Sequence, residues 1–338
     1  MGRIATRRVE SEGPAARLFE EGVVWDNHTC TTLTPTRGDW MAHLQRHRDV
    51  GVDVVCLNVG FDVAPPMDAL LLLAEFRRWV EAHSAEYTLL DRPEDIDRLR
   101  SEKNKLGVCF NLEGGNALLG SIHMISLYYR LGVRWMLFAY NKTNELSGGC
   151  QDEDTGLTDF GRAVMDEMER VGMVVCCSHI GHRSAMEILE RASRPVIFSH
   201  SNPRALWEHP RNIRDEAILA CAKTGGVVGI NGIGIFLGKN DIATDLIVRH
   251  CDYVASLVGP DHVGLALDYV YDQQELTDFV KSHPETYPPG DYPNGVLMVE
   301  PERFPAIAEA LLKSGHGEQD VCKILGGNHV RIARQVWK

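Results

Sequence analysis

Apolar residues along the chain recur in short runs, which polar turns and amphipathic stretches separate. Eight runs are rich in Val, Ile, Leu and Cys, and they span residues 23–29, 52–59, 106–114, 133–141, 172–181, 195–202, 225–233 and 262–270. Their nearly continuous hydrophobicity is typical of parallel strands that are buried on both faces. Between most of them the apolar positions follow a helical period, most clearly at 67–84 and 160–172, where Thr158 and Asp159 offer a capping region for the second helix.

Eight strand–helix units favour a (β/α)8 TIM barrel, an α/β fold, over an open sheet. A doubly wound sheet would place a glycine-rich phosphate-binding turn after its first strand, whereas the first run continues as WDNHTCTTLTP. The length of 338 residues suits one barrel with insertions. We therefore expect a single domain over 1–338, with an N-terminal extension at 1–22 and a long loop insertion at 271–300 after the eighth strand.

The composition narrows the range of partners. Hydrophobic residues make up 44% of the chain, and 47 acidic against 35 basic residues leave a net charge of −12, which disfavours nucleic acid. No apolar run reaches the ~18 residues that span a bilayer, and the charged N-terminal stretch MGRIATRRVESEGP lacks the apolar region of a secretory signal. The nine cysteines lie mostly inside apolar runs, which predicts reduced, buried thiols. We therefore expect a cytoplasmic protein that binds neither nucleic acid nor membranes.

Residue types that bind metals or transfer protons follow the predicted strands. In a barrel of this kind the carboxyl ends of the strands meet at one rim, where the active site lies. The candidates at this rim are Asp26, His28, Cys30, Glu113, His179, His200 and Asp268. A single histidine at such a place is more often structural than a ligand, but several strands that bring histidines and carboxylates together favour a divalent cation between them. Solvated surface positions are expected for His43, His47, His83, His250, His283 and His316.

Several short motifs occur in the order known from one enzyme family. WDNHTC resembles a D-G-H-x-D opening, NLEGGN resembles E-G-G-H, and SHIG and FSHSN resemble two separate histidine motifs. HPRNIRDE, GLALDYV and ILGGNHVRI resemble a later arginine segment, a G-S-D-F segment and a C-terminal G-G-N-x-x-R-V segment. Each motif alone is weak, but the ordered set from about residue 23 to 334 resembles the membrane (renal) dipeptidase family of the amidohydrolase superfamily.

The resemblance implies a binuclear zinc site that hydrolyses peptide bonds. His28 and Cys30 would hold the first of two zinc ions, and His179 and His200 would hold the second. Glu113 would bridge both ions and offset their mutual repulsion. A water held between the ions would become hydroxide near neutral pH.

The resemblance also implies roles for three further residues. Asp268 would take the proton of the water and return it to the leaving amine. Arg211 would bind the free carboxylate of the substrate, although a surface salt bridge with Asp215 or Glu216 explains an arginine at this position equally well. Asn116, which stands where the family usually has a histidine, would contact the substrate or the tetrahedral intermediate.

Cys30 stands where the family has an aspartate ligand, and three arrangements remain open. The thiolate ligates the first metal, or the thiol stays neutral and the first site is weak or empty, or Asp26 takes the place of Cys30. We favour ligation, because two cations near one carboxylate need further negative charge and a cation lowers the pKa of a neighbouring thiol.

The leading interpretation is a zinc-dependent dipeptidase that acts on short peptides with free termini. One alternative is another amidohydrolase reaction on the same barrel, with an N-acyl amino acid or a lactone as the substrate. The other is a diverged, non-hydrolytic binding protein, which Cys30 and Asn116 favour and which the retention of the remaining site residues disfavours. A small peptide is the expected partner, and a homodimer is expected by resemblance only.

Overall fold

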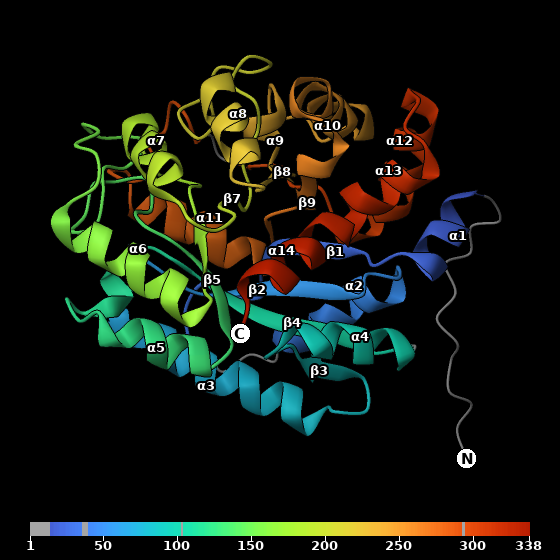
Figure 1. Ribbon diagram of the computed structural model, residues 1–338, viewed down its shortest axis with the longest axis horizontal. Coiled ribbons are helices and arrows are strands. Elements are labelled where there is room, and N and C mark those ends of the chain that lie inside the picture. The colour runs from blue at the N-terminus through green and yellow to red at the C-terminus, as the bar shows by residue number, and fades with distance from the viewer. Residues whose placement is uncertain (1–13, 36–39, 103, 293–294) are drawn as a thin grey trace.

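The computed structural model describes residues 14–35, 40–102, 104–292 and 295–338, and a parallel β-sheet forms its centre (Figure 1). The strands are β1 (Trp25–Cys30), β2 (Val54–Phe61), β3 (Tyr87–Leu89), β4 (Leu106–Glu113), β5 (Val133–Leu137), β6 (Val174–Cys176), β7 (Ile197–Phe198), β8 (Val227–Asn231), β9 (Val263–Ala266) and β10 (Tyr269–Val270). All except β3 overlap the eight predicted runs, and β9 and β10 share the last run. The unexpected β3 pairs with β4 beside the main path of the sheet.

The sheet is curled, and its strands follow the order β10-β1-β2-β4-β5-β6-β7-β8-β9. Its two end strands, β9 and β10, are separated along the chain by only Leu267 and Asp268. Within the described residues β1 forms a ladder with β10 but none with β9. Two hydrogen bonds cross this junction, from Leu267 N to Asp26 Oδ1 (2.9 Å) and from Asp268 N to His28 O (3.0 Å). The fold is therefore α/β and of the TIM-barrel type that the sequence predicted, but strand pairing does not close the barrel.

Helices surround the strands on the outside of the curled sheet (Figure 1). They are α1 (Pro14–Glu21), α2 (Gln45–Asp49), α3 (Pro66–Ala82), α4 (Pro93–Ser101), α5 (His123–Arg130), α6 (Asp159–Val171), α7 (His182–Arg191), α8 (Asp215–Lys223), α9 (Gly234–Leu237), α10 (Thr244–Val258), α11 (Gln273–Ser282), α12 (Phe304–Ser314), α13 (Glu318–Cys322) and α14 (Asn328–Val336). The two helices that were clearest in the sequence appear as α3 and α6. Thr158 caps α6 as predicted, because its Oγ1 accepts a hydrogen bond from Gly161 N over 2.9 Å.

Strand residues alternate between two buried clusters, which explains the continuous hydrophobic runs. In β2, Val55 and Leu57 pack in the cluster that includes helix residues such as Phe76 of α3. Val54 and Cys56, on the other face of the strand, pack in the cluster that contains residues of β1, β5, β6, β7 and β8. Both faces of the sheet are therefore buried, as in other parallel sheets covered by helices. All nine cysteines are free thiols.

The segment 271–300, which was expected to be a long loop, contains the helix α11. The carboxylate of Glu275 in this helix accepts hydrogen bonds from Thr32 Oγ1 and Leu33 N, each over 2.8 Å, and from Thr34 N over 3.1 Å. The segment is thus fastened to the residues that follow β1. Of the expected N-terminal extension, Pro14–Glu21 forms α1, and residues 1–13 lie outside the described residues. Among the described helices, none combines the length and the apolarity that a membrane crossing requires.

Two of the histidines that were expected at the surface are buried. His250 in α10 is 1% exposed, and its Nε2 donates a hydrogen bond to Leu237 O over 3.0 Å. His47 in α2 is fully buried, and its two ring nitrogens contact Asp26 and Tyr271. The surface prediction was wrong because both rings lie on the inner faces of their helices, where each has at least one polar partner.

Candidate active site

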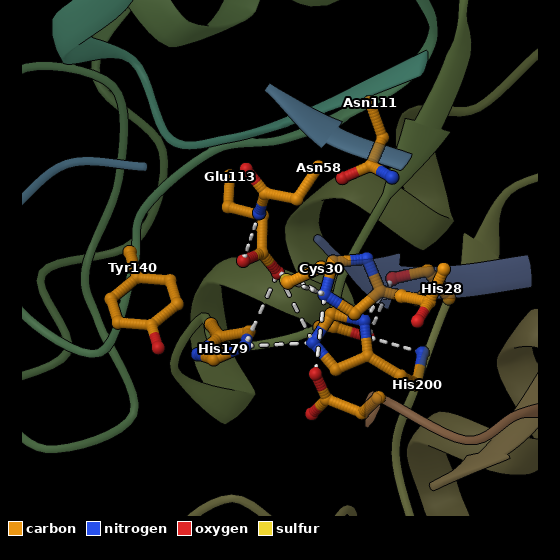
Figure 2. Close-up of polar contacts among 12 residues, drawn as sticks. His28, Cys30, Asn58, Asn111, Glu113, Tyr140, His179 and His200 are labelled. Carbon is orange, nitrogen blue, oxygen red and sulfur yellow. Dashed lines mark hydrogen bonds and ion pairs between the residues drawn. The ribbon is translucent and has the colours of Figure 1, made fainter. Parts of the chain in front are cut away.

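Five of the predicted site residues come together at the carboxyl ends of the strands (Figure 2). His28 lies in β1 and Glu113 ends β4, whereas His179, His200 and Asp268 follow β6, β7 and β9. Glu113 Oε1 lies 3.6, 3.5 and 3.2 Å from the Nε2 atoms of His28, His179 and His200. Asp268 Oδ1 lies 3.3 Å from His28 Nε2, and the Nε2 atoms of His179 and His200 are 2.8 Å apart. Three imidazoles and two carboxylates therefore share one small volume.

The backbone of this rim adopts unusual conformations. His179, Asp268 and Asn141 have φ values of 67°, 56° and 62°. These values lie in the left-handed region, which residues other than Gly, Asn and Asp rarely adopt. Such conformations cost free energy and persist where the surrounding structure enforces them, often at functional sites. Here they turn the chain sharply after a strand.

Hydrogen bonds orient the imidazoles. The Nδ1 of His179 lies 2.7 Å from Asn141 Oδ1, and because an amide oxygen only accepts, this Nδ1 carries the proton. The lone pair of His179 Nε2 is then available to the cluster. His200 Nδ1 likewise bonds Ser199 Oγ over 2.8 Å. Protein partners of this kind, on the far nitrogen of a histidine, are typical of metal-binding histidines.

Two asparagines hold the carboxylates. Asn58 Nδ2 donates to Glu113 Oε2 over 2.6 Å, and Asn231 Nδ2 donates to Asp268 Oδ2 over 2.8 Å. In each case one oxygen is bound by the amide and the other, Oε1 or Oδ1, faces the imidazoles. The sequence analysis missed these two orienting roles and those of Asn141 and Ser199. A position at a strand end was the available signal for Asn141 and Asn231.

Asp26 lies behind the cluster and is already engaged by protein donors. Its Oδ2 lies 2.9 Å from His47 Nε2, and its Oδ1 accepts from Leu267 N (2.9 Å) and from His28 N (3.5 Å). The other ring nitrogen of His47 lies 2.7 Å from the Tyr271 hydroxyl. This arrangement disfavours Asp26 as a substitute for Cys30, because Oδ1 is bound at the junction between β1 and the end of β9 and Oδ2 is bound by His47 of α2.

Burial dominates the protonation of the cluster. It raises the pKa of Glu113 to about 7 and lowers the pKa values of His179 and His200 well below their usual value. Burial also lowers the pKa of His28, but the charges of Glu113 and Asp268 outweigh this effect and hold it well above the usual value. The donors are therefore poorly solvated, and a positive charge among them is favourable.

The donor atoms fit a divalent metal. Glu113 Oε1, the atom on which the imidazoles converge, is buried and has no hydrogen-bond partner. The donor atoms form two sets, and within each set all atoms lie within 4.8 Å of one another. One set comes from His28, His200 and Asp268, and the other from Glu113, His179 and His200. Imidazole nitrogen and carboxylate oxygen are common ligands of zinc and other first-row metals.

Cys30 lies beside this donor set but is not part of either group. Its Sγ is 4.0 Å from His28 Nε2, and the side chain is buried in the wall of the cavity described below. Burial raises the pKa of the thiol to about 11, and the neighbouring His28 only partly offsets this effect. The thiol therefore lies next to the donor set without belonging to it.

Arg211 is buried, and its guanidinium is only partly satisfied. Its Nη2 donates to His200 O over 3.2 Å, whereas Nε is buried with no hydrogen-bond partner. The alternative of a surface salt bridge with Asp215 or Glu216 is wrong, because Arg211 is only 3% exposed and donates to His200 O, and Asp215 accepts from Tyr253 instead. A buried cation with a free donor suits an anionic ligand.

The structure does not bring Asn116 to the cluster. The residue is exposed, its Nδ2 donates to Asp62 O over 2.7 Å, and its backbone N donates to Asp62 Oδ1 over 2.9 Å. These bonds anchor the turn after β4 to the end of β2. The expected contact of Asn116 with substrate therefore finds no support in the geometry.

A mostly apolar cavity opens over the cluster. Glu113, His179 and Asp268 line it together with three tyrosines that the sequence analysis did not single out, namely Tyr140, Tyr287 and Tyr292. A second, polar cavity lies next to it and shares His179 with it, and Arg211 lines this second cavity. Substrate groups on either side of a bond held at the cluster would thus meet different surroundings.

A curled parallel sheet with imidazole and carboxylate donors at its carboxyl ends defines a barrel-type metal-binding protein. Residues 40–284 match the family described as membrane dipeptidase (peptidase family M19), and the chain belongs to this family. It is 27% identical to "Dipeptidase 3" of Rattus norvegicus over 277 residues, and 28% identical to "Dipeptidase tcpJ" of Claviceps purpurea over 265 residues. These matches cover 80% and 77% of this chain but only 53% and 58% of the relatives, so the chain spans little more than half of their length.

A solved structure extends the likeness over the whole chain. The amidohydrolase from Pseudomonas aeruginosa is 27% identical and superimposes with a TM-score of 0.86, covering 96% of this chain and 99% of that one. Family membership and the geometry of the cluster therefore agree with each other.

Proposed function

We propose that this protein is a zinc-dependent dipeptidase, which hydrolyses the peptide bond of short peptides with free termini. The observation that carries the proposal is the convergence of three imidazole Nε2 atoms on Glu113 Oε1, with Asp268 at 3.3 Å from one of them. Membership of the membrane dipeptidase family and the names of the two relatives support the choice of substrate.

The residues of the cluster would have two roles, metal binding and proton transfer. His28, Glu113, His179 and His200 would hold the metal, and we propose two ions, with the shared His200 serving one of them because an imidazole nitrogen has a single lone pair. Bound zinc would supply Lewis acidity and lower the pKa of a water to near neutrality. Asp268 would take the proton of the attacking water on Oδ1 and return it to the leaving amine. Its Oδ2 is held by Asn231, so that Oδ1 keeps its direction during both transfers.

Metal analysis combined with a substrate panel tests this proposal. The purified protein, stripped with a chelator and reloaded with zinc, is assayed with free dipeptides, amidated dipeptides, N-acyl amino acids and lactones. We expect dipeptide turnover that disappears on stripping and returns with zinc. Turnover of the acyl amino acids or lactones alone would favour the alternative amidohydrolase reaction. A zinc-loaded chain that binds dipeptides and cleaves none of them would indicate a non-hydrolytic binding protein.

Arg211→Ala is expected to weaken the binding of substrates with a free carboxylate. Loss of one charge-assisted contact should raise KM by about 10- to 150-fold, equivalent to roughly 1.5–3 kcal/mol. Kinetics with matched free and amidated dipeptides measure the effect. Arg183→Ala serves as the control, because Arg183 is exposed and pairs with Glu187 on the surface. An equal loss on free and amidated substrates would remove Arg211 from carboxylate recognition.

We propose that Cys30 ligates the first zinc ion. The distance of 4.0 Å between Cys30 Sγ and His28 Nε2 supports this proposal. Cys30→Ser should then lose one zinc per chain, whereas Cys30→Asp should keep both and accept a wider range of metals, because thiolate is a soft ligand. Metal content by elemental analysis measures both. Cys322→Ser is the control, since this thiol lies in α13. If the serine variant retains full zinc and full activity, Cys30 is not a ligand.

A further inference from the structure

The cavity above the cluster contains a pair of tyrosine hydroxyls that come from distant parts of the chain. Tyr140 follows β5, and Tyr287 lies after α11 in the segment that is fastened over β1. The Tyr287 hydroxyl donates a hydrogen bond to the Tyr140 oxygen over 3.0 Å. Both side chains line the same cavity as Glu113 and Asp268. The hydroxyl pair therefore belongs to the surroundings of any bond that is held at the cluster.

Tyr140 is placed next to the donor cluster by two contacts. Its ring stacks on the His179 ring with a centroid distance of 4.2 Å and an interplanar angle of 24°. Its backbone N donates to Asp62 Oδ2 over 3.1 Å, which anchors the start of the loop after β5. Figure 2 shows the phenol beside His179, on the side of the cluster away from His28. The position of the hydroxyl is thus set by both the backbone and the ring.

The hydroxyl proton of Tyr140 is available for a ligand. Because Tyr287 donates to the Tyr140 oxygen, the proton of Tyr140 itself points elsewhere, and it has no acceptor among the described residues. Among the other donors that line this cavity, Asn58 Nδ2 is bonded to Glu113, whereas the Tyr292 oxygen accepts from Gln151 and its proton is also without a described acceptor. Asn116 lies outside the cavity, and Arg211 lines the neighbouring one. Tyr140 is therefore a free neutral donor, and it differs from Tyr292 in that its ring stacks directly on His179.

We propose that Tyr140 donates a hydrogen bond to the carbonyl oxygen of the bond that is cleaved, and that Tyr287 positions Tyr140 for this contact. The inference rests on the proposed dipeptidase function. A water-derived oxygen adds to the carbonyl carbon, and the π electrons of the C=O bond move to the carbonyl oxygen. Tyr140 stabilises that developing charge without giving up its proton. When the C=O bond re-forms, the C–N electron pair leaves with the nitrogen, which takes the proton held by Asp268.

The variants Tyr140→Phe, Tyr287→Phe and the double variant test this proposal in the zinc-loaded protein. Tyr140→Phe should lower kcat by about 10²-fold while KM changes by no more than about threefold, because the contact strengthens only as charge develops. Its affinity for a phosphinate dipeptide mimic, measured by calorimetry, should fall by a similar factor, because the tetrahedral phosphinate carries charge where the carbonyl oxygen becomes negative. Zinc content and the temperature of unfolding should match those of the unmodified protein.

The effect of Tyr287→Phe separates a positioning role from a direct one. It should lower kcat by about tenfold, and the double variant should be no worse than Tyr140→Phe alone, since Tyr287 acts through Tyr140. Tyr253→Phe is the control for loss of a hydroxyl, because its partner is Asp215 and it lies outside the cavity.

Each of the following results would overturn the proposal. An unchanged kcat and an unchanged phosphinate affinity in Tyr140→Phe would exclude the hydrogen bond from Tyr140 to the carbonyl oxygen. A rise in KM alone would show that Tyr140 contributes to substrate binding and not to the stabilisation of the developing charge. A loss of kcat in Tyr292→Phe instead would transfer the role to Tyr292, whose oxygen accepts from Gln151. An unmodified protein that neither cleaves dipeptides nor binds the phosphinate would overturn this inference together with the dipeptidase function. Normal cleavage with no effect of the tyrosine variants would overturn this inference alone.

Discussion

Asp268→Asn is expected to lower kcat by about 10²-fold or more, while the fold and the zinc content stay nearly intact. The amide has the shape of the carboxylate, and asparagine tolerates the left-handed backbone that Asp268 adopts at φ 56°. It cannot, however, take a proton from water and return it to an amine. Steady-state kinetics and elemental analysis of the same preparation measure both quantities.

The Asp268 variant also distinguishes two roles of the side chain. Asp268 Oδ1 belongs to one of the two donor sets, so a loss of zinc that accompanies the loss of turnover would make it a ligand instead of a proton carrier. Near-normal turnover would remove it from the mechanism. Asp272→Asn is a suitable control, because Asp272 caps α11 through a hydrogen bond from Glu275 N that asparagine can also accept.

Glu113→Gln is expected to have the largest effect, a loss of at least one zinc per chain and of turnover by on the order of 10³-fold or more. Glu113 Oε1 is the atom on which the three imidazoles converge, at 3.2 to 3.6 Å. A neutral amide cannot offset the charge of two cations, and its NH₂ group would compete with them for the imidazole lone pairs.

Zinc content, turnover and thermal unfolding of the Glu113 variant are compared with those of Glu167→Gln. Glu167 pairs with Arg170 at the surface, and its neutralisation should leave metal and activity unchanged. A Glu113→Gln protein with full zinc and full turnover would show that the carboxylate is not needed for the site.

The strands were predictable because both faces of a parallel sheet are buried, which leaves an uninterrupted apolar run for each strand. Tyr87–Leu89 escaped prediction because a three-residue strand beside the main path has no such run. The helix α11 was missed for a related reason. None of its residues is fully buried, so the segment has little of the periodic apolar pattern by which α3 and α6 were found.

Reasoning from strand ends found the acidic and basic members of the cluster but not their neutral neighbours. His28, Glu113, His179 and His200 were visible because parallel strands place their carboxyl ends at one edge. Tyr140 was not, since an aromatic residue at the end of an apolar run is indistinguishable from a core residue in the sequence. Asn116 was chosen because of its place in a motif, and the structure leaves it exposed.

The sequence by itself determined the alternation of strands and helices and the chemistry at the strand ends, since both depend on local patterns of polarity. Only the tertiary structure decided which atoms face one another. Asn141 orients the ring of His179, although the two residues are 38 positions apart in the sequence. His47 contacts the carboxylate of Asp26 across 21 positions. Tyr287 reaches Tyr140 across 147 positions. These contacts depend on how separate strands and loops pack together, and local periodicity specifies the face on which a side chain lies but not the partner that it meets there.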